Sequence, residues 1–196
     1  MNKVGIRIEI PRRLEESAQL KRAIAKSKVG EIECMVNFIV MAYRKGGKVV
    51  LLGNGGSAAD AQHLACEMVG QFAIKRQAFP AIALTTNVSI LTAVANDCGY
   101  EMVFSRQIEA LVNENDVVIG ISTSGNSPSV IEAMKAAKMR GAKSIGLTGG
   151  NGGKLAEVAD LILIVPSDST PRIQEAHMTI GHIVCELVER ELSVTG

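Results

Sequence analysis

Two titratable side chains, His63 and Glu67, stand four residues apart in the stretch 51–67, LLGNGGSAADAQHLACE. That spacing puts both on one face of a helix, where they could act as an acid and a base or as metal ligands. Taken alone, such a pair is more often an ordinary solvated contact between neighbouring turns of a helix. The pair predicts a site only if other groups converge on it.

A glycine-rich turn precedes this pair. Gly53, Gly55 and Gly56 allow a sharp turn and a close approach of the backbone to a ligand, and Ser57 is expected to cap the following helix. A helix start presents unpaired N–H groups, which favour an anion. The run GNGGSA also fits a loose dinucleotide-binding pattern, but the next expected strand ends in a leucine and two threonines, without the acidic residue that this pattern needs. The sequence therefore argues against a nicotinamide cofactor.

Hydroxyl groups gather in a second turn, at Ser122, Thr123, Ser124 and Ser127. Pro128 suits the first position of a helix, which makes Ser127 the expected cap. Hydroxyls and helix N–H groups together could hold a phosphate. Neither turn carries the lysine of a nucleotide P-loop, so a phosphate on a small, uncharged body such as a sugar fits better than a triphosphate.

Apolar segments alternate with helical patterns along residues 48–196. Strands are expected at 48–52, 81–84, 116–121, 143–148 and 161–165, with helices at about 57–70, 86–94, 100–112, 128–141 and 171–192. Buried strands alternating with helices predict an α/β fold with a doubly wound, five-stranded parallel sheet. The flavodoxin-like strand order 2-1-3-4-5, taken by analogy, would place the two turns on either side of one crevice.

Residues 1–47 are expected to form part of the same domain as the core at 48–196. The first 11 residues alternate isoleucine with charge before Pro11, and we expect a poorly constrained arm or a short strand there. Helical spacing then predicts two helices, broken near Gly30 and ended by Gly46-Gly47. These helices could pack between subunits.

The composition indicates an ordinary globular protein of one domain. A net charge of +1 over 196 residues gives no electrostatic case for nucleic acid or an anionic membrane. No apolar run approaches the roughly 18 residues of a membrane span. The scattered cysteines suggest buried free thiols in a reducing cytosol, with neither a thiolate metal site nor disulfides. We therefore expect a cytoplasmic protein.

Four motifs together resemble the phosphoheptose isomerase family of sugar isomerase (SIS) domain proteins. They are the glycine turn at 53–57, Asn96-Asp97, the run GISTSGNS at 120–127 and the segment RIQEAH at 172–177. The resemblance covers about residues 48–191. It implies a homotetramer with shared active sites that interconverts sedoheptulose 7-phosphate and D-glycero-D-manno-heptose 7-phosphate through an enediol. That step leads toward ADP- or GDP-heptose precursors of lipopolysaccharide or other surface glycans.

The resemblance also implies roles for individual residues. It implies one zinc ion per subunit, held by His63, Glu67, Gln174 and His182, with Glu67 and His182 as acid–base groups. Gln174 and His182 are roughly 80° apart around one helix, so both can lean into one site. The substrate would contact Asn54, Gly55, Gly56, Glu67, Asn96, Asp97, Ser122, Thr123, Ser124, Ser127 and Gln174.

One position departs from the family. Gln71 stands where members commonly have arginine, which could reach the substrate from a neighbouring subunit. Gln71 cannot supply that charge, so this contact is not expected here. His177, on the closing helix, is expected to be a surface residue.

Two other functions remain open at this stage. Some SIS proteins are non-catalytic tetramers that bind a partner or sense a sugar phosphate. Among them is a protein that associates with the initiator of bacterial replication and has a run close to Ser57–His63. That protein lacks equivalents of Glu67 and His182, so their presence here favours an enzyme. Nothing in the sequence excludes an isomerase of another sugar phosphate.

Overall fold

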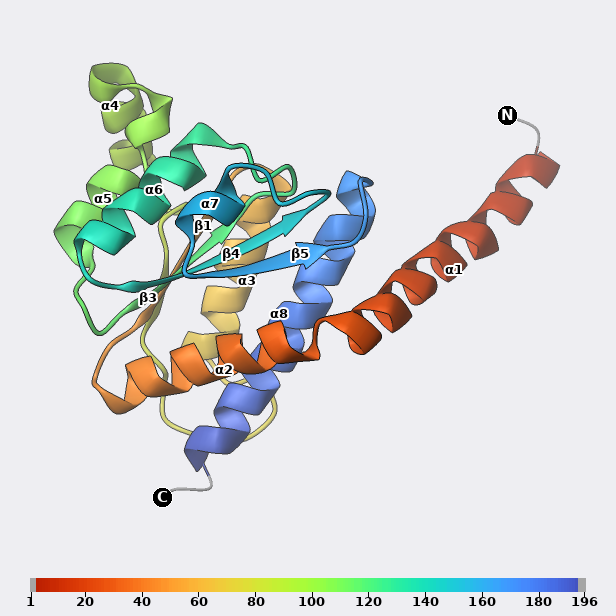
Figure 1. Ribbon diagram of the computed structural model, residues 1–196, viewed down its shortest axis with the longest axis horizontal. Coiled ribbons are helices and arrows are strands. Elements are labelled where there is room, and N and C mark those ends of the chain that lie inside the picture. Colours follow the sequence, from red (N-terminus) through yellow and green to blue (C-terminus); the bar gives the residue numbers. More distant parts are fainter. Residues whose placement is uncertain (1–2, 194–196) are drawn as a thin grey trace.

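The computed structural model describes residues 3–193, and its centre is a parallel sheet with helices on both faces (Figure 1). The described residues form five strands in the order β2-β1-β3-β4-β5, and every neighbouring pair is parallel. Both the α/β fold class and the strand order agree with the sequence-based prediction. The strands are β1 (Val49–Gly53), β2 (Ala81–Ala83), β3 (Val117–Ile121), β4 (Lys143–Gly149) and β5 (Leu161–Val165).

The helices cover the sheet in two layers, because side chains alternate between the two faces of a strand. Val49 and Leu51 pack with α2 and α8 on one face, whereas Val50 and Leu52 pack with α5 and α6 on the other. The helices are α1 (Lys3–Ser27), α2 (Val29–Arg44), α3 (Gly56–Val69), α4 (Val88–Cys98), α5 (Ser105–Leu111), α6 (Pro128–Met139), α7 (Leu155–Val158) and α8 (Thr170–Ser193), with a short 3₁₀ turn at Tyr100–Met102.

The register of the two central strands positions the two turns. Leu52 of β1 pairs with Gly120 of β3, and Gly53 pairs with Ile121, so both strands end at the same level. Every residue of both strands is buried. The glycine turn and the serine turn therefore leave the sheet side by side, at its switch point.

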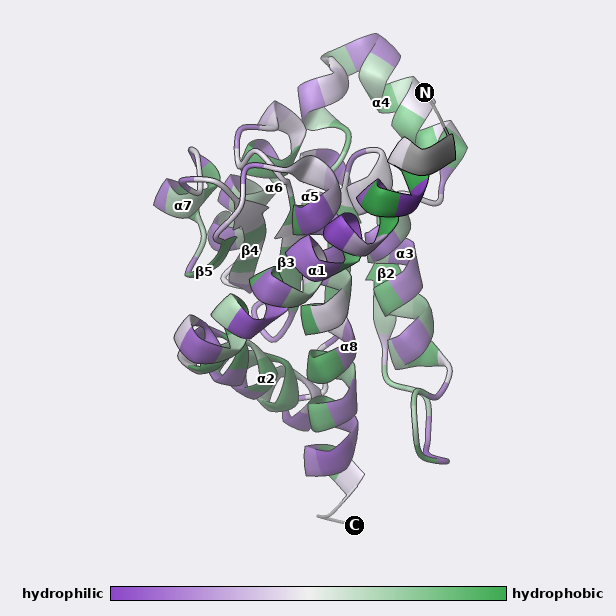
Figure 2. Ribbon diagram, turned by 90° about the vertical axis from the view of Figure 1, so that its right-hand side faces the viewer, coloured by the Kyte–Doolittle hydropathy of each residue, from purple (hydrophilic) through white to green (hydrophobic). Residues whose placement is uncertain are grey.

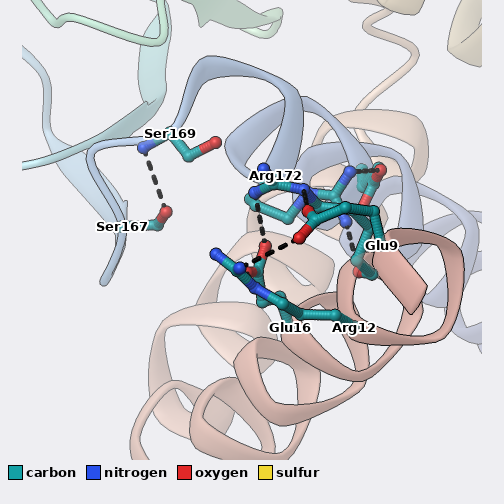
Figure 3. Close-up of polar contacts among 8 residues, drawn as sticks. Glu9, Arg12, Glu16, Ser167, Ser169 and Arg172 are labelled. Carbon is teal, nitrogen blue, oxygen red and sulfur yellow. Dashed lines mark hydrogen bonds and ion pairs between the residues drawn. The ribbon is translucent and has the colours of Figure 1, made fainter. Parts of the chain in front are cut away.

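The beginning of the chain differs from our expectation of an arm or short strand. Residues 3–27 form one helix, α1, which continues through Pro11 and extends away from the sheet (Figure 1). Ion pairs one turn apart support it, since Arg12 contacts both Glu9 and Glu16. Figure 3 shows these pairs beside Arg172, whose guanidinium donates to the carbonyl of Arg13 at 2.6 Å. The break between helices lies at Lys28, and Gly30 belongs to α2.

Three further expectations about local structure were wrong. Gly55 occupies the N-cap of α3, so Ser57 lies inside the first turn, where it is buried. The helix expected over 100–112 is divided into a 3₁₀ turn at Tyr100–Met102 and α5, with the buried Val103 and Phe104 between them. The thiols are not uniformly buried: Cys185 is buried, but Cys66 and Cys98 are exposed. None of the helices within residues 3–193 is long and apolar enough to cross a membrane.

Candidate active site

Two helices bring His63, Glu67 and His182 together. The Nε2 atom of His63 lies 2.9 Å from Nε2 of His182 on α8 and 3.2 Å from Oε1 of Glu67, one turn further along α3. A side chain at Gly181 would meet the methyl groups of Leu64, beginning at 2.5 Å. Glycine at this position thus allows α8 to approach α3 closely beside the histidine pair.

The three side chains fit a divalent metal ion. One ligand atom from each residue lies within 4.8 Å of the others. Two imidazole nitrogens and one carboxylate match the donor set of catalytic zinc sites, in which another position is left for water or substrate. The same three groups could also exchange protons directly, because a neutral imidazole offers one donor and one acceptor nitrogen.

Gln174, the fourth expected metal ligand, lies against the glycine turn. A Cβ atom added to Gly56 would come within 2.3 Å of the Gln174 carboxamide nitrogen, so any side chain at position 56 would displace it. Gly55 has a φ of 56°, in the left-handed region that favours glycine. Gly56 therefore allows the close contact between the turn and α8, whereas Gly55 allows the backbone conformation of the turn. Whether Gln174 binds a metal stays a prediction.

Asn54 joins the two turns. Its Nδ2 donates to the hydroxyl oxygens of Ser127, at 2.7 Å, and Ser129, at 3.0 Å. Its Oδ1 accepts a hydrogen bond of 2.8 Å from the hydroxyl of Tyr100. The hydroxyl of Ser127, which precedes α6 as expected, thus contacts Asn54 and makes no capping bond to the helix. Tyr100 and Ser129 were not predicted from the sequence, although both stand within three residues of one of its motifs.

The remaining residues of the serine turn border a small polar pocket. Ser122 is buried, while Thr123 and Ser124 line a cavity of about 360 Å³ at the ends of β3 and β4. That volume falls within the range of small-molecule sites. Asp168 and Thr170, which precede and begin α8, line the same cavity and were not anticipated. The other lining residues are Gly149, Gly150, Asn151 and Ile173.

Asn96 and Asp97 lie in the last turn of α4. The Asn96 carboxamide donates to the Asp97 carboxylate at 2.7 Å, and both side chains are exposed. No residue of α4 is buried, and Figure 1 shows this helix standing out from the sheet. Their expected contact with substrate stays a prediction.

His177 corrects the expectation of a surface residue. It is completely buried, and its Nε2–H group donates to the carbonyl of Thr148 at 3.2 Å. Burial lowers the pKa of His177 to about 4, although the bond to Thr148 acts in the opposite direction. His177 is therefore a neutral core residue that ties α8 to the end of β4.

Asp60 is a further residue near His63 that was not predicted from the sequence. It lies one turn before His63, and its Oδ2 atom is buried without a hydrogen-bond partner. Burial raises the pKa of this carboxyl group, while the nearby His63 lowers it. The spacing of three residues from His63 was the signal that could have indicated it.

The fold and the site together define a class. A doubly wound parallel sheet with N–H-rich turns at its switch point is typical of α/β proteins that bind small anionic ligands. The cluster of two imidazoles and a carboxylate on α3 and α8 adds groups that can transfer protons.

The comparisons with known proteins refine this class. A family model described as "SIS domain" matches residues 14–149. The phosphoheptose isomerase of Citrifermentans bemidjiense is 52% identical over 96% of this chain and 98% of its own, and that of Aquifex aeolicus is 54% identical over 89% and 91%. The solved phosphoheptose isomerase of Neisseria gonorrhoeae has a TM-score of 0.89 at 41% identity, covering 94% of this chain and 99% of its own. That of Francisella tularensis has a TM-score of 0.91 at 36% identity, covering 97% and 100%.

The chain therefore belongs to the SIS domain family and, within it, to the phosphoheptose isomerases. This membership makes it an aldose–ketose isomerase of heptose phosphates.

Proposed function

We propose that the protein interconverts sedoheptulose 7-phosphate and D-glycero-D-manno-heptose 7-phosphate by proton transfer through an enediol. The observation that carries this proposal is the convergence of His63, Glu67 and His182 from two helices, α3 and α8, of which α3 begins at the glycine turn. An aldose–ketose isomerisation moves one proton between adjacent carbons and another between their oxygens. It needs a base at carbon and a second proton-transfer group at oxygen, and this cluster offers both.

The two turns account for substrate binding. We assign the phosphate to the serine turn, whose hydroxyls at Ser122, Thr123, Ser124 and Ser127 adjoin the start of α6. Asn54, Gly55 and Gly56 then lie beside the sugar. Asn96, Asp97 and Gln174 complete the proposed contacts with its hydroxyl groups.

Glu67 and His182 divide the proton transfers. The Glu67 carboxylate takes the proton from the carbon next to the carbonyl and returns it to the neighbouring carbon. His182 passes the accompanying proton between the two oxygens. The side chain of Glu67 is about one-fifth exposed, so it is partly desolvated yet open to a ligand.

Zinc fits the same residues. His63, Glu67 and His182, with Gln174 as the proposed fourth ligand, would hold the ion, which when bound supplies a Lewis acid for the substrate oxygens. His63 then acts mainly to complete this donor set.

We also propose a homotetramer whose subunits share active sites. An apolar groove of about 540 Å³ lies between α1, α2 and α8. Figure 2 shows that α2 and α8 carry many hydrophobic residues. Ile6, Ile10 and Leu14 are exposed on α1, and α4 buries no residue although it carries Asn96 and Asp97. A second copy would cover these surfaces. Sedimentation equilibrium tests this point, and a monomer at micromolar concentration would contradict it.

The proposed setting is the cytoplasm, in the synthesis of ADP- or GDP-heptose precursors for lipopolysaccharide or other surface glycans. The free thiols support a reducing compartment.

Glu67→Gln tests the mechanism most sharply. The variant keeps the size and shape of the side chain but replaces the carboxylate with an uncharged carboxamide and so removes the base. Turnover should therefore fall by about 10²- to 10⁴-fold while sedoheptulose 7-phosphate still binds. Glu109→Gln, in an exposed ion pair on α5, is the matched control and should leave turnover unchanged. Near-normal turnover by Glu67→Gln would rule out the assigned role.

A further inference from the structure

A buried ion pair organises the segment between α3 and β2, which contains neither helix nor strand over residues 70–80. The Nε atom of Arg76 lies 2.7 Å from Oε1 of Glu189 on α8, and the two side chains are only 6% and 2% exposed. The carboxylate of Glu189 also accepts hydrogen bonds from the backbone N–H groups of Phe72, Ala73 and Ile74, at 2.8 to 3.1 Å.

Arg76 uses its other N–H groups to close the end of α3. It donates to the carbonyl of Glu67 at 3.0 Å, to that of Met68 at 3.0 Å and to that of Gly70 at 3.2 Å. The last carbonyls of a helix lack partners within it, and a cation is favourable there. The guanidinium also stacks 3.9 Å from the ring centre of Phe79. Arg76 thus holds the turn of α3 that contains Glu67.

The same segment reaches the other proton-transfer group. The ring of Phe72 lies 5.5 Å, centre to centre, from the imidazole of His182. Phe72 is held there because its own N–H group donates to Glu189, seven residues further along α8. The ion pair therefore connects α3 at Glu67 with the ring that packs on His182.

The electrostatics fit a fixed, charged pair. Burial alone would raise the pKa of Glu189, but the N–H groups of the segment and Arg76 outweigh it and lower that pKa. A buried ion pair contributes little net stability compared with apolar residues of similar volume. Stability alone is therefore a weak explanation for the presence of this ion pair. Its geometry, in contrast, connects Glu67 on α3 with the ring that packs on His182.

We propose that Arg76 and Glu189 are positioning residues, which fix Glu67 and His182 relative to each other through the end of α3 and the ring of Phe72. This inference rests on the proposed roles of Glu67 and His182. Neither Arg76 nor Glu189 is assigned a contact with substrate. Their role is to keep the two proton-transfer groups within the narrow geometry that the reaction and the metal require.

The test uses conservative variants of the full-length protein. Arg76→Lys keeps the charge but loses the planar fork, and Glu189→Gln keeps the shape but not the charge. Both should lower kcat about 10- to 100-fold and weaken the affinity for zinc by a similar factor, with KM changed less than about twofold, because the serine turn stays intact. The matched controls are Arg106→Lys and Glu109→Gln, the same changes in an exposed ion pair on α5.

Phe72→Ala separates positioning from simple stabilisation, since it leaves the ion pair in place but removes the ring from His182. It should also lower kcat and zinc affinity, and it keeps the inference testable if the ion-pair variants do not fold. Zinc titration of the purified protein measures the affinity of the site for zinc without relying on turnover. A failure of the proposed isomerase reaction can therefore be distinguished from a failure of the positioning role. The proposal would be overturned if the variants folded with lowered thermal unfolding midpoints but kept the kcat and the zinc affinity of the control variants.

Discussion

His177 shows how a single buried side chain can set the response of the protein to acid. Its Nε2–H group is bonded to Thr148, and burial holds its pKa near 4, compared with an ordinary value of 6.5. As the pH falls, the unfolded chain therefore takes up a proton at this residue before the folded chain does. The resulting loss of stability begins below about pH 6.5 and is complete near pH 4.

The first prediction concerns this pH range. The free energy of unfolding should fall by up to about 3 kcal/mol between pH 6.5 and pH 4 because of His177 alone, and should be insensitive to it above pH 6.5. Urea unfolding across this range compares the wild type with His177→Gln, which cannot titrate. The variant's stability should depend less steeply on pH. Equal slopes in the two proteins would show that His177 is not held neutral.

His177 also shows why a residue can be misassigned from sequence. The prediction of a surface position used the angle between His177 and Gln174 around the helix. It assumed that α8 has one face toward the site and the other toward solvent. The buried positions of α8 instead follow the stripe Ile173, His177, Ile180 and Val184, at spacings of four, three and four. The stripe was visible in the sequence, but the presence of a histidine in it suggested exposure.

At the scale of elements, the packing of α3 on α8 decides whether the site forms. Gly181 lies at this contact, and Leu64, which a side chain at position 181 would meet, is itself buried and has little room to move. Gly181→Ala should push the helices apart, destabilise the fold by about 1–3 kcal/mol and lower turnover. Urea unfolding and kcat measure the two effects.

Gly30→Ala is the control for this change, because nothing lies within 4 Å of the added atom. A helical glycine replaced by alanine at such a place should be neutral or stabilising, by up to about 1 kcal/mol. If Gly181→Ala had the same free energy of unfolding and kcat as Gly30→Ala, the contact between position 181 and Leu64 would not limit how closely α8 approaches α3.

The sequence predicted the elements of the sheet well, because apolar strands and the glycine and serine turns carry strong local signals. It failed at α1, where the alternation of Ile6, Ile8 and Ile10 has the two-residue period of a strand, whereas in the helix Ile8 lies on the opposite side from Ile6 and Ile10. The ion pairs of Arg12 and the contact of Arg172 with Arg13 favour the helix, and the second is a long-range interaction that no local pattern reveals. The ion pair between Arg76 and Glu189 was missed for the same reason, because the two residues are 113 positions apart in the sequence.

The candidate site could be predicted only in part. Spacing paired His63 with Glu67, and the family resemblance added His182, which the structure places 2.9 Å from His63. The resemblance also implied Gln174, but it could not indicate the contact of Gln174 with Gly56, because that contact depends on how the glycine turn packs.

At the scale of the whole molecule, α1 and α4 extend from the body of the chain (Figure 1), and exposed apolar residues such as Leu14 and Val88 lie on them. In the proposed tetramer, neighbouring subunits would cover these apolar surfaces. It also gives a reason for Asn96 and Asp97 to stand at the end of a helix that buries none of its own residues.

The most direct test of this account is turnover of sedoheptulose 7-phosphate by the purified protein, measured before chelation, after chelation and after return of zinc. The account predicts turnover that chelation abolishes and zinc restores, because it assigns metal binding and proton transfer to one site, formed by His63, Glu67 and His182. Turnover that resists chelation would contradict the role of zinc while leaving the acid–base roles of Glu67 and His182. The absence of turnover with any metal would contradict the central claim that this chain is a heptose phosphate isomerase.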